Sequence, residues 1–296
     1  MVEQDTRAVL ITGCSSGFGY LIAKTLAMAG HHVFATMRGI NGRNAEPAHD
    51  LTGWGRANNV ELEVLELDVT SDESVNDAVV SATASAGRID IVVNNAGASA
   101  RGPIEAFSIT EMQALFNLNV FGPMRVNKAV LPQMRERRSG LLIHVTSTLG
   151  RILPRSGGLY PSTKWALEGL AESLHYQLRP FAIDSVILEP GSFPTPATSK
   201  SPEASRQDIA AAYAAVAAPP RPREATAGYV APDSQEVADA IKTLIDTPAG
   251  QRPLRTVVGP IFTEGVDEYN EFYERAKDRL WQSLQRPDQA ITWGRR

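Results

Sequence analysis

Residues 12–19, Thr12-Gly13-Cys14-Ser15-Ser16-Gly17-Phe18-Gly19, join the apolar segment Ala8–Thr12 to Tyr20–Ala29, whose apolar positions recur with helical period. A glycine-rich turn between a strand and a helix is typical of sites that bind the pyrophosphate of a dinucleotide. Gly13 permits a tight turn, Gly17 lets the backbone approach a phosphate, and Gly19 allows the helix to pack closely on the sheet. The spacing G-x-x-x-G-x-G differs from the commoner G-x-G-x-x-G, so an ordinary strand–helix turn is the alternative interpretation of this motif alone.

The alternation of strand and helix continues along the chain and predicts an α/β fold. Several candidate strands are nearly all apolar, as strands covered on both faces are. The alternation favours a doubly wound parallel sheet with helices on both faces, built as one domain over residues 1–296. The candidate strands are Ala8–Thr12, His32–Ala35, Glu61–Leu67, Ile89–Val93, Leu141–Thr146 and Ile183–Leu188.

Two regions interrupt the alternation. Residues 192–233 are rich in Pro, Ala, Ser and Thr, and we expect a substrate lid there, with a helix over Ala204–Ala218. Residues 263–296 form a C-terminal extension, with an amphipathic helix predicted over Thr263–Gln285. Packing of this helix on the domain or on a second subunit is favoured over a membrane-surface helix, because its polar face mixes acidic and basic side chains.

Composition limits the function classes. The chain has 296 residues, of which 43% are hydrophobic and 21% charged, so a large core is expected. The net charge of −4 argues against general nucleic-acid binding. Cys14 is the single cysteine, which excludes an intrachain disulfide and a four-cysteine zinc site and favours the cytoplasm. We predict no metal site, no signal peptide at the acidic N-terminus and no transmembrane helix, since no run of 18 apolar residues occurs.

The end of the second strand indicates which dinucleotide binds. An acidic side chain at this position binds the 2′-hydroxyl of the adenosine ribose in NAD(H). The chain instead reads Val33-Phe34-Ala35-Thr36-Met37-Arg38, and a guanidinium pairs well with a 2′-phosphate. Ser16 is placed to add a hydroxyl. We therefore predict NADP(H) in preference to NAD(H), with a solvated loop cation as the alternative role for Arg38.

A serine, a tyrosine and a lysine follow in a pattern suited to proton transfer. Tyr160 and Lys164 are four residues apart, so they share one face of a helix. A nearby ammonium and a positive nicotinamide ring favour the phenolate and lower the pKa of Tyr160, which lets the pair exchange a proton with a carbinol oxygen. Ser147 ends a strand, where its hydroxyl reaches bound ligands, and Asn119 lies on a preceding helix. Each residue alone has an ordinary structural explanation, and their joint occurrence after the turn carries the prediction.

Taken together, these residues resemble the short-chain dehydrogenase/reductase family, in its compact branch. Besides the turn and the four residues above, three segments carry the resemblance over about residues 6–258. They are Asp68-Val69, which resembles the adenine-contacting pair, Asn94-Asn95-Ala96-Gly97, and Pro190-Gly191 with Phe193 and Thr195, which resembles the segment that holds the nicotinamide carboxamide. Within the family, the chain is most similar to the group of 17β-hydroxysteroid and retinol dehydrogenases.

The resemblance implies a Rossmann-type seven-stranded parallel sheet of order 3-2-1-4-5-6-7, with Leu254–Val258 as the seventh strand. It also implies hydride transfer between a nicotinamide cofactor and a carbonyl or alcohol. Tyr160 would be the acid/base and Ser147 the carbonyl polariser. Lys164 would bind the ribose and lower the pKa of Tyr160, and Asn119 would position a water in a proton relay. A homodimer or homotetramer through the helices of Asn119 and Tyr160 is implied as well.

The expected substrate is a hydrophobic ketone, aldehyde or secondary alcohol. We expect the substrate pocket to be mostly apolar, with Ser147 and Tyr160 at its reactive end and Leu149, Leu153, Leu159 and Phe193 along its walls. Two other functions use the same features. One is a nonenzymatic dinucleotide sensor, since fold does not fix function, and the other is a lyase or epimerase that uses the cofactor transiently.

Overall fold

Seven short strands form one sheet in the computed structural model, which describes residues 6–154, 157–195, 201–215, 231–260 and 263–284. Their order, β3-β2-β1-β4-β5-β6-β7, confirms the predicted order, and each neighbouring pair is parallel. Most predicted strand boundaries are correct to within one or two residues. The strands are β1 Ala8–Thr12, β2 His32–Met37, β3 Leu62–Glu66, β4 Ile91–Asn94, β5 Gly140–Val145, β6 Ile183–Pro190 and β7 Arg255–Val258.

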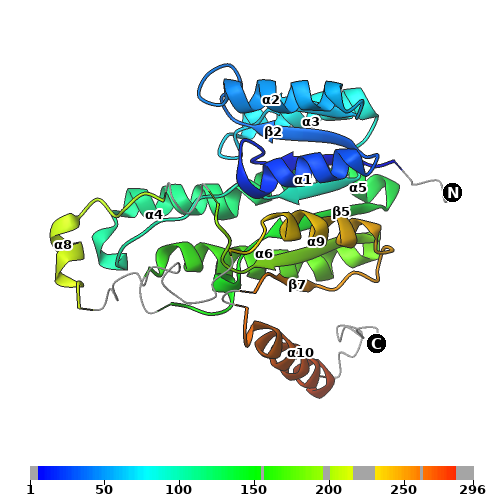
Figure 1. The fold of residues 1–296 in the computed structure, drawn as a ribbon. Helices are drawn as coiled ribbons and strands as arrows, with labels where there is room; N and C mark the ends of the chain where they lie inside the picture. Colours follow the sequence, from blue (N-terminus) through cyan, green and yellow to red (C-terminus); the bar gives the residue numbers. More distant parts are fainter. Residues whose placement is uncertain (1–5, 155–156, 196–200, 216–230, 261–262, 285–296) are drawn as a thin grey trace.

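Helices cover both faces of the sheet (Figure 1). One apolar cluster joins the sheet to α1 (Gly17–Met28), α2 (Ala45–Ala57) and α9 (Gln235–Asp246). A second cluster, on the opposite face, joins it to α3 (Asp72–Ala86), α5 (Gly122–Arg137) and the end of α6 (Leu159–Leu178). Because both faces are buried, strands β1 and β4 carry no exposed residue. Within the described ranges, no helix combines the length and apolar content needed to cross a bilayer.

The sheet reverses its order between β1 and β4, which are neighbours although β2 and β3 lie between them in the chain. The connections from β1 and β4 therefore leave toward opposite faces, and a crevice opens at the carboxyl ends of these strands. This crevice is where ligands bind in open parallel sheets of this kind.

Helix α3 shows how local residues set the ends of an element. The Ser71 hydroxyl accepts a hydrogen bond from the Ser74 amide at 3.2 Å and so caps the helix. Gly87 ends the helix with φ +77°, and a Cβ there would meet no atom within 4 Å. Gly87 is therefore used for its backbone conformation alone.

The predicted lid is described in part, over residues 192–195, 201–215 and 231–233, and its residues 196–200 and 216–230 lie outside the described residues. The predicted helix over Ala204–Ala218 is too long, since α8 spans Gln207–Ala212. The amides of Ala204 and Arg206 bind the carbonyls of Arg101 and Ala106 instead of starting a helix. This pairing holds α8 beside the segment that follows β4.

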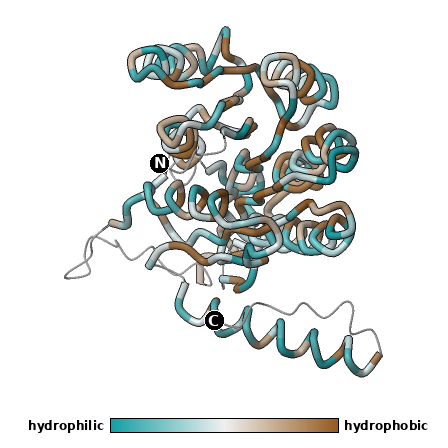
Figure 2. The backbone as a smooth tube through the Cα atoms, turned by 90° about the vertical axis from the view of Figure 1, so that its right-hand side faces the viewer, coloured by the Kyte–Doolittle hydropathy of each residue, from teal (hydrophilic) through white to brown (hydrophobic). Residues whose placement is uncertain are grey.

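The C-terminal helix α10 spans Val266–Ser283, within the predicted Thr263–Gln285, and residues 285–296 lie outside the described residues. It packs on the domain, which agrees with the favoured interpretation. The predicted apolar positions of this helix are buried only in part, since Val266 is buried but Phe272 is 58% exposed and Leu280 52% exposed. The buried face carries Val266 together with the polar Asn270 and Lys277. Figure 2 shows the helix, at the bottom of the view, mostly in hydrophilic teal.

Candidate active site

A cleft of about 830 Å³ lies at the carboxyl ends of the central strands. Four predicted site residues, Gly19, Asn119, Leu153 and Leu159, are not part of its lining. The other predicted residues all line it. They are Gly13, Ser15, Ser16, Gly17, Phe18, Arg38, Asp68, Val69, Asn95, Ala96, Gly97, Ser147, Leu149, Tyr160, Lys164, Pro190, Gly191, Phe193 and Thr195.

The glycine-rich turn is fixed by the segment that follows β4. The Thr12 hydroxyl accepts hydrogen bonds from the amides of Asn95 and Ala96, each at 3.0 Å, and the Asn95 side-chain amide donates to the Thr12 carbonyl at 2.8 Å. Gly13 has φ +77°, and a Cβ there would lie 2.9 Å from the Cα of Ala96. Only glycine fits this position, because both the conformation and the space exclude a side chain.

Gly19 has a different role from the one predicted. A Cβ on Gly19 would collide with the Gly13 carbonyl. It would also lie 2.6 Å from the side-chain nitrogen of Asn95. Gly19 thus lets the first turn of α1 close onto the loop before it. The N-cap Ser16 makes no capping hydrogen bond through its side chain, so the first amides of α1 stay available to an anion.

Cys14 belongs to this turn, and its side chain points into the protein interior. Its side chain is fully buried, its thiol donates to the Ile11 carbonyl at 3.3 Å, and its amide donates to the Thr36 carbonyl at 2.9 Å. Burial raises the pKa of the thiol to about 12, against the opposing effect of a backbone hydrogen bond from Thr36. The thiol is therefore a packing group and not a nucleophile.

Arg38 and Asp68 lie at the adenosine end of the cleft. The Arg38 guanidinium is 3.8 Å from the Asp68 carboxylate, with 46% of the arginine side chain exposed. Burial alone raises the pKa of Asp68, but hydrogen bonds from Thr70 and the charges of Arg38 and Arg43 outweigh it, so this pKa lies below its ordinary value. Arg43 also lines the cleft. Sequence reasoning missed it, although its position five residues after Arg38, in the same loop, was a usable signal.

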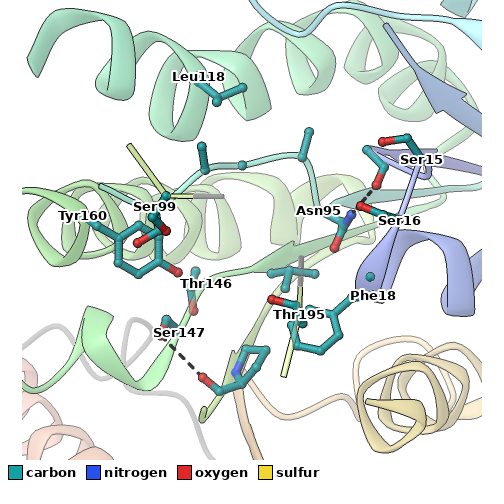
Figure 3. Close-up of a pocket in the computed structure, with 18 of the residues that line it drawn as sticks. Ser15, Ser16, Phe18, Asn95, Ser99, Leu118, Thr146, Ser147, Tyr160 and Thr195 are labelled. Carbon is teal, nitrogen blue, oxygen red and sulfur yellow. Dashed lines mark hydrogen bonds between the residues drawn. The ribbon is translucent and has the colours of Figure 1, made fainter. Parts of the chain in front are cut away.

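Tyr160 and Ser147 meet at the other end of the cleft. Figure 3 shows both side chains directed into the same part of it. Burial raises the pKa of Tyr160 to about 12, and a hydrogen bond with Ser147 acts in the opposite direction. The Ser147 hydroxyl accepts from the Leu149 amide at 3.2 Å and faces the Pro190 carbonyl at 3.5 Å. The lowered tyrosine pKa that the sequence predicts is not found in the protein alone, because burial dominates.

Lys164 lies one helical turn after Tyr160 on α6. Its ammonium donates to the Val145 carbonyl at 2.9 Å and lies 5.7 Å from the centre of the Tyr160 ring. Burial lowers the pKa of Lys164 to about 8, while the charge of Glu168 acts to raise it. The two residues thus share a face, as their spacing predicts, and the cation lies beside the phenol.

Asn119 lies in a π-helical turn, Asn117–Phe121, between α4 (Ile109–Phe116) and α5. Its side-chain oxygen accepts from the Ala98 amide at 3.0 Å, and its nitrogen donates to the Ala98 carbonyl at 2.9 Å and to the Thr163 hydroxyl at 3.0 Å. The Asn119 side chain therefore clamps the segment after β4 to α6. Single π turns inside helices are frequent at functional sites.

The substrate end of the cleft is less apolar than predicted. Leu149 and Phe193 line it, and the Phe193 ring packs edge-on against Phe18 at 5.5 Å between ring centres. Leu153 is 58% exposed and points elsewhere. Sequence reasoning missed several lining residues that follow strand ends, a position that was itself a signal. They are the polar Ser99, Thr146 and Thr148. A further missed residue, the apolar Leu118, lies on the π turn instead.

Comparison with known proteins agrees with this geometry. The model of the short chain dehydrogenase family matches residues 7–206. Retinol dehydrogenase 8 of Bos taurus is 41% identical over 188 residues, which are 62% of this chain and 58% of the relative, so the match spans little more than half of that protein.

Two solved structures extend the comparison over most of the chain. A short-chain dehydrogenase from Streptomyces avermitilis is 31% identical, covers 95% of this chain and 98% of its own, and has a TM-score of 0.72. An alcohol dehydrogenase from the archaeon Thermococcus sibiricus, complexed with 5-hydroxy-NADP, is 27% identical, covers 86% and 96%, and has a TM-score of 0.68. The cleft thus has the fold and lining of a nicotinamide dinucleotide site.

Proposed function

The chain belongs to the short chain dehydrogenase family, and from this premise we propose that it is an NADP(H)-dependent oxidoreductase. It interconverts a hydrophobic ketone or aldehyde and the corresponding alcohol by hydride transfer. The observation that carries the proposal is the meeting of Ser147, Tyr160 and Lys164 in the cleft that the Thr12–Gly19 turn also lines. A site that only binds a dinucleotide has no need of a phenol, an ammonium and a hydroxyl together.

The lining fits the dinucleotide. The turn, with Gly13 at φ +77° and Gly17 at φ +59°, leaves backbone amides open to the pyrophosphate at the start of α1. Asp68 and Val69 would hold the adenine, and residues 190–195 the carboxamide of the nicotinamide. When bound, the nicotinamide ring supplies or accepts the hydride.

NADP(H) is the proposed preference because of the charge at the adenosine end. Arg38 and Arg43 both line the cleft there, and the second strand ends without a carboxylate. The long 3.8 Å contact between Arg38 and Asp68 leaves most of the guanidinium's hydrogen-bonding capacity for a 2′-phosphate. The solved relative from Thermococcus sibiricus binds an NADP derivative, which supports the same preference.

Tyr160 provides the proton when a carbonyl is reduced. Because burial raises its pKa to about 12, the phenol is protonated at neutral pH and donates to the carbonyl oxygen as that oxygen gains charge. The hydroxyl of Ser147 donates to the same oxygen, and the neighbouring Lys164 ammonium stabilises the phenolate left behind. With a pKa of about 8, Lys164 keeps most of its charge at neutral pH and would also bind the ribose hydroxyls. In the oxidative direction the same groups take up the proton.

The proposed substrate is an apolar carbonyl compound or alcohol. Leu118, Leu149 and Phe193 give the cleft apolar lining, and the relative from Bos taurus is named for an apolar alcohol, retinol. Apart from Lys164, which would bind the ribose, the lysine and arginine residues of the lining are Arg38 and Arg43, and both lie at the adenosine end, away from Tyr160. A phosphorylated or CoA-linked substrate would want cations near the reactive end as well.

The assembly and the compartment are proposed from the family and the composition. We propose a homodimer or homotetramer through the helices that carry Asn119 and Tyr160, and a cytoplasmic location that suits a chain with one cysteine. Light scattering of the purified protein tests the assembly, and a monomer at micromolar concentration would contradict it.

The test is a direct one. Purified protein is titrated with NADPH and with NADH by nicotinamide fluorescence, and oxidation of the reduced cofactor is then followed with a panel of apolar ketones and aldehydes beside acidic and CoA-linked ones. We expect tighter binding of NADPH and turnover of the apolar members. Turnover of acidic or CoA-linked members alone would contradict the substrate class. Binding without any turnover would favour the dinucleotide sensor instead.

A further inference from the structure

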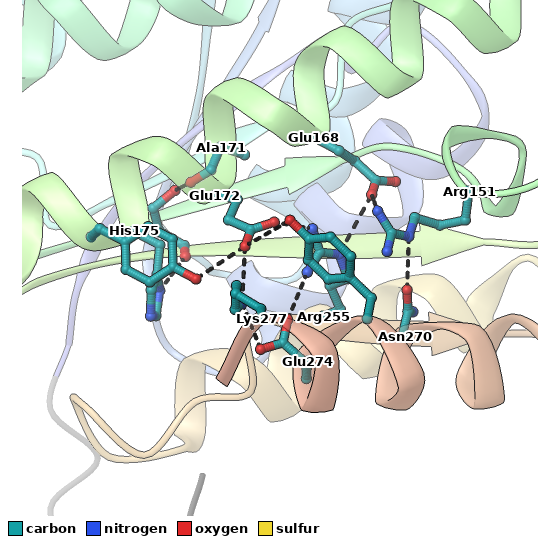
Figure 4. A network of polar contacts seen from close by, with 12 residues as sticks. Arg151, Glu168, Ala171, Glu172, His175, Arg255, Asn270, Glu274 and Lys277 are labelled. Carbon is teal, nitrogen blue, oxygen red and sulfur yellow. Dashed lines mark hydrogen bonds and ion pairs between the residues drawn. The ribbon is translucent and has the colours of Figure 1, made fainter. Parts of the chain in front are cut away.

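A buried group of charged and polar side chains joins α10 to the rest of the domain (Figure 4). It lies between α10, α6 and the ends of β6 and β7, and it takes no part in the chemistry proposed above. Its members are Arg151, Glu168, Glu172, Glu189, Arg255, Asn270, Glu274 and Lys277.

Asn270 links two segments within this group. Its side-chain oxygen accepts a hydrogen bond from Arg151 Nε at 2.8 Å, and its side-chain nitrogen donates to Glu189 Oε2 at 2.7 Å. Asn270 is only 9% exposed, so water does not replace these bonds readily. One side chain of α10 therefore holds residues that are 38 positions apart in the chain.

Both segments touch the hydroxyl of Ser147. Arg151 directly follows the 3-10 turn Thr148–Gly150, within which the Leu149 amide donates to Ser147 Oγ at 3.2 Å. Glu189 directly precedes Pro190, whose carbonyl lies 3.5 Å from the same oxygen. Asn270 thus ties together the two pieces of backbone that set the direction of the Ser147 hydroxyl.

The surroundings make this tie rigid. The Arg151 guanidinium lies 4.7 Å from the Tyr269 ring and 4.9 Å from the Tyr273 ring, and it is 3.5 Å from Glu168. Burial raises the pKa of both Glu168 and Glu189, and the charge of Glu189 adds to the rise at Glu168, so this carboxyl pair retains a proton at neutral pH. The retained proton removes the repulsion that two buried carboxylates would otherwise exert on this position.

We propose that Asn270 is a positioning residue for the reaction, acting from the C-terminal helix through Arg151 and Glu189 to hold the Ser147 hydroxyl toward the substrate oxygen. The inference rests on the proposed function and adds a residue to it that touches neither substrate nor cofactor. The glycine-rich turn and Arg38, which would hold the pyrophosphate and the 2′-phosphate, make none of the contacts described here, so we expect a larger effect on the chemical step than on NADPH binding.

The first experiment is a double-mutant cycle. Asn270→Ala is expected to lower kcat about tenfold, equivalent to 1.4 kcal/mol, with the Kd for NADPH changed less than about twofold. In a Ser147→Ala background the same substitution is expected to change kcat less than about twofold, because there is no hydroxyl left to position. Equal losses in both backgrounds, or a matching loss of NADPH affinity, would overturn the proposal.

Two further variants separate positioning from folding. Glu271→Ala, at an exposed neighbouring position of α10, is the matched control and should leave kcat and the melting temperature unchanged. Asn270→Asp keeps the acceptor for Arg151 but loses the donor to Glu189, and it is nearly the same shape as the native side chain. If Asn270→Ala does not fold, the Asn270→Asp variant tests the positioning role instead, and we expect its kcat to be several-fold lower than that of the wild type. A wild-type kcat in Asn270→Asp would then overturn the proposal.

A measurement without turnover keeps this inference distinct from the proposed function. Amide hydrogen exchange over residues 147–151 and 189–191 is expected to be at least about tenfold faster in Asn270→Asp than in wild type, with residues 12–19 unchanged. Unchanged exchange in both segments contradicts the role of Asn270 even if the wild type is active. A wild type that turns over no substrate contradicts the proposed function, while the exchange result still decides the role of Asn270.

Discussion

The two halves of the cleft are held in shape by different means. The half around β1 and β4 is fixed by short contacts between neighbouring loops, chiefly the Thr12 hydroxyl bound by the amides of Asn95 and Ala96. The half around Ser147 and Tyr160 is fixed from behind, by buried side chains that reach it from a helix more than 100 residues later. If the proposed function is right, the contacts of the turn with the dinucleotide and the contacts that orient Ser147 belong to separate sets and can be disrupted one at a time.

Loss of the tyrosine hydroxyl should show this separation most strongly. Tyr160→Phe removes the only proposed proton donor, so kcat should fall by about 10²–10⁴-fold, the usual contribution of a positioned acid. The Kd for NADPH should change little, because the ring still fills its place beside Lys164. Steady-state kinetics and a fluorescence titration measure the two quantities. A comparable loss of both would mean that the tyrosine supports the structure of the whole cleft.

A charge reversal at the adenosine end should change cofactor affinity and leave the chemical step unchanged. Arg38→Asp removes a charge-assisted hydrogen bond to the 2′-phosphate, which is worth about 1.5–3 kcal/mol, so NADPH affinity should fall by roughly 10–100-fold. NADH affinity should hold or improve, and kcat at saturating cofactor should stay the same. The matched control is Arg56→Asp, which makes the same charge change at an exposed position of α2 outside the cleft. An unchanged preference in Arg38→Asp would exclude the phosphate-binding role.

Gly13→Ala should weaken NADPH binding by straining the backbone of the glycine-rich turn. A residue with a Cβ at φ +77° costs about 1–2 kcal/mol, and the new atom would also press on Ala96, so NADPH should bind about tenfold more weakly. Gly87→Ala is a close control because it has the same φ, with no neighbouring atom and no role in the cleft. The control should lower stability and leave affinity intact. Equal NADPH affinities in the two variants would show that the turn tolerates a side chain.

The smallest effect is expected from a pH titration of the second half. Burial, together with the charge of Glu189, raises the pKa of Glu168 from 4.5 to about 8, against the charges of Arg255 and Arg151. A group with a raised pKa in the folded state stabilises the protein fully below its unfolded pKa, and this contribution is lost as the pH rises through the folded value. Between pH 5 and about pH 8.5 the wild type should therefore lose about 1 kcal/mol or more relative to Glu168→Gln.

Calorimetry at several pH values measures this difference as a shift of roughly 2–4 °C in melting temperature for each 1 kcal/mol. Glutamine keeps the shape of the protonated carboxyl and does not titrate, so its melting curve serves as the reference. Parallel pH dependences of the two proteins would mean that Glu168 is already ionised at pH 5. The first half of the cleft would then not differ from the second in its response to pH.

The sequence was informative wherever a function depends on residues close together in the chain. The turn at residues 12–19 and the pair Tyr160 and Lys164 follow from short motifs, because local spacing sets the backbone they need, whereas the strand order was predicted only through the family resemblance that those motifs carry. Asn270 and Arg151 left no such signal, since their roles arise only when α10 packs on the domain. The apolar pattern predicted the buried positions of α10 only in part, because that helix docks largely through charged and amide side chains and leaves Phe272 exposed to solvent.

The thiol of Cys14, in the glycine-rich turn, can be used to detect local opening of the protein around it. It is the single thiol in the chain, it has no exposed surface, and with a pKa of about 12 only ~1 in 10,000 molecules would carry the thiolate at pH 8. An alkylating reagent can therefore react only in molecules in which the segment around Cys14, between β1 and α1, has opened. The labelling rate would give the free energy of that local opening in unmodified protein, and its slowing by added NADPH would measure how strongly the cofactor closes that part of the fold.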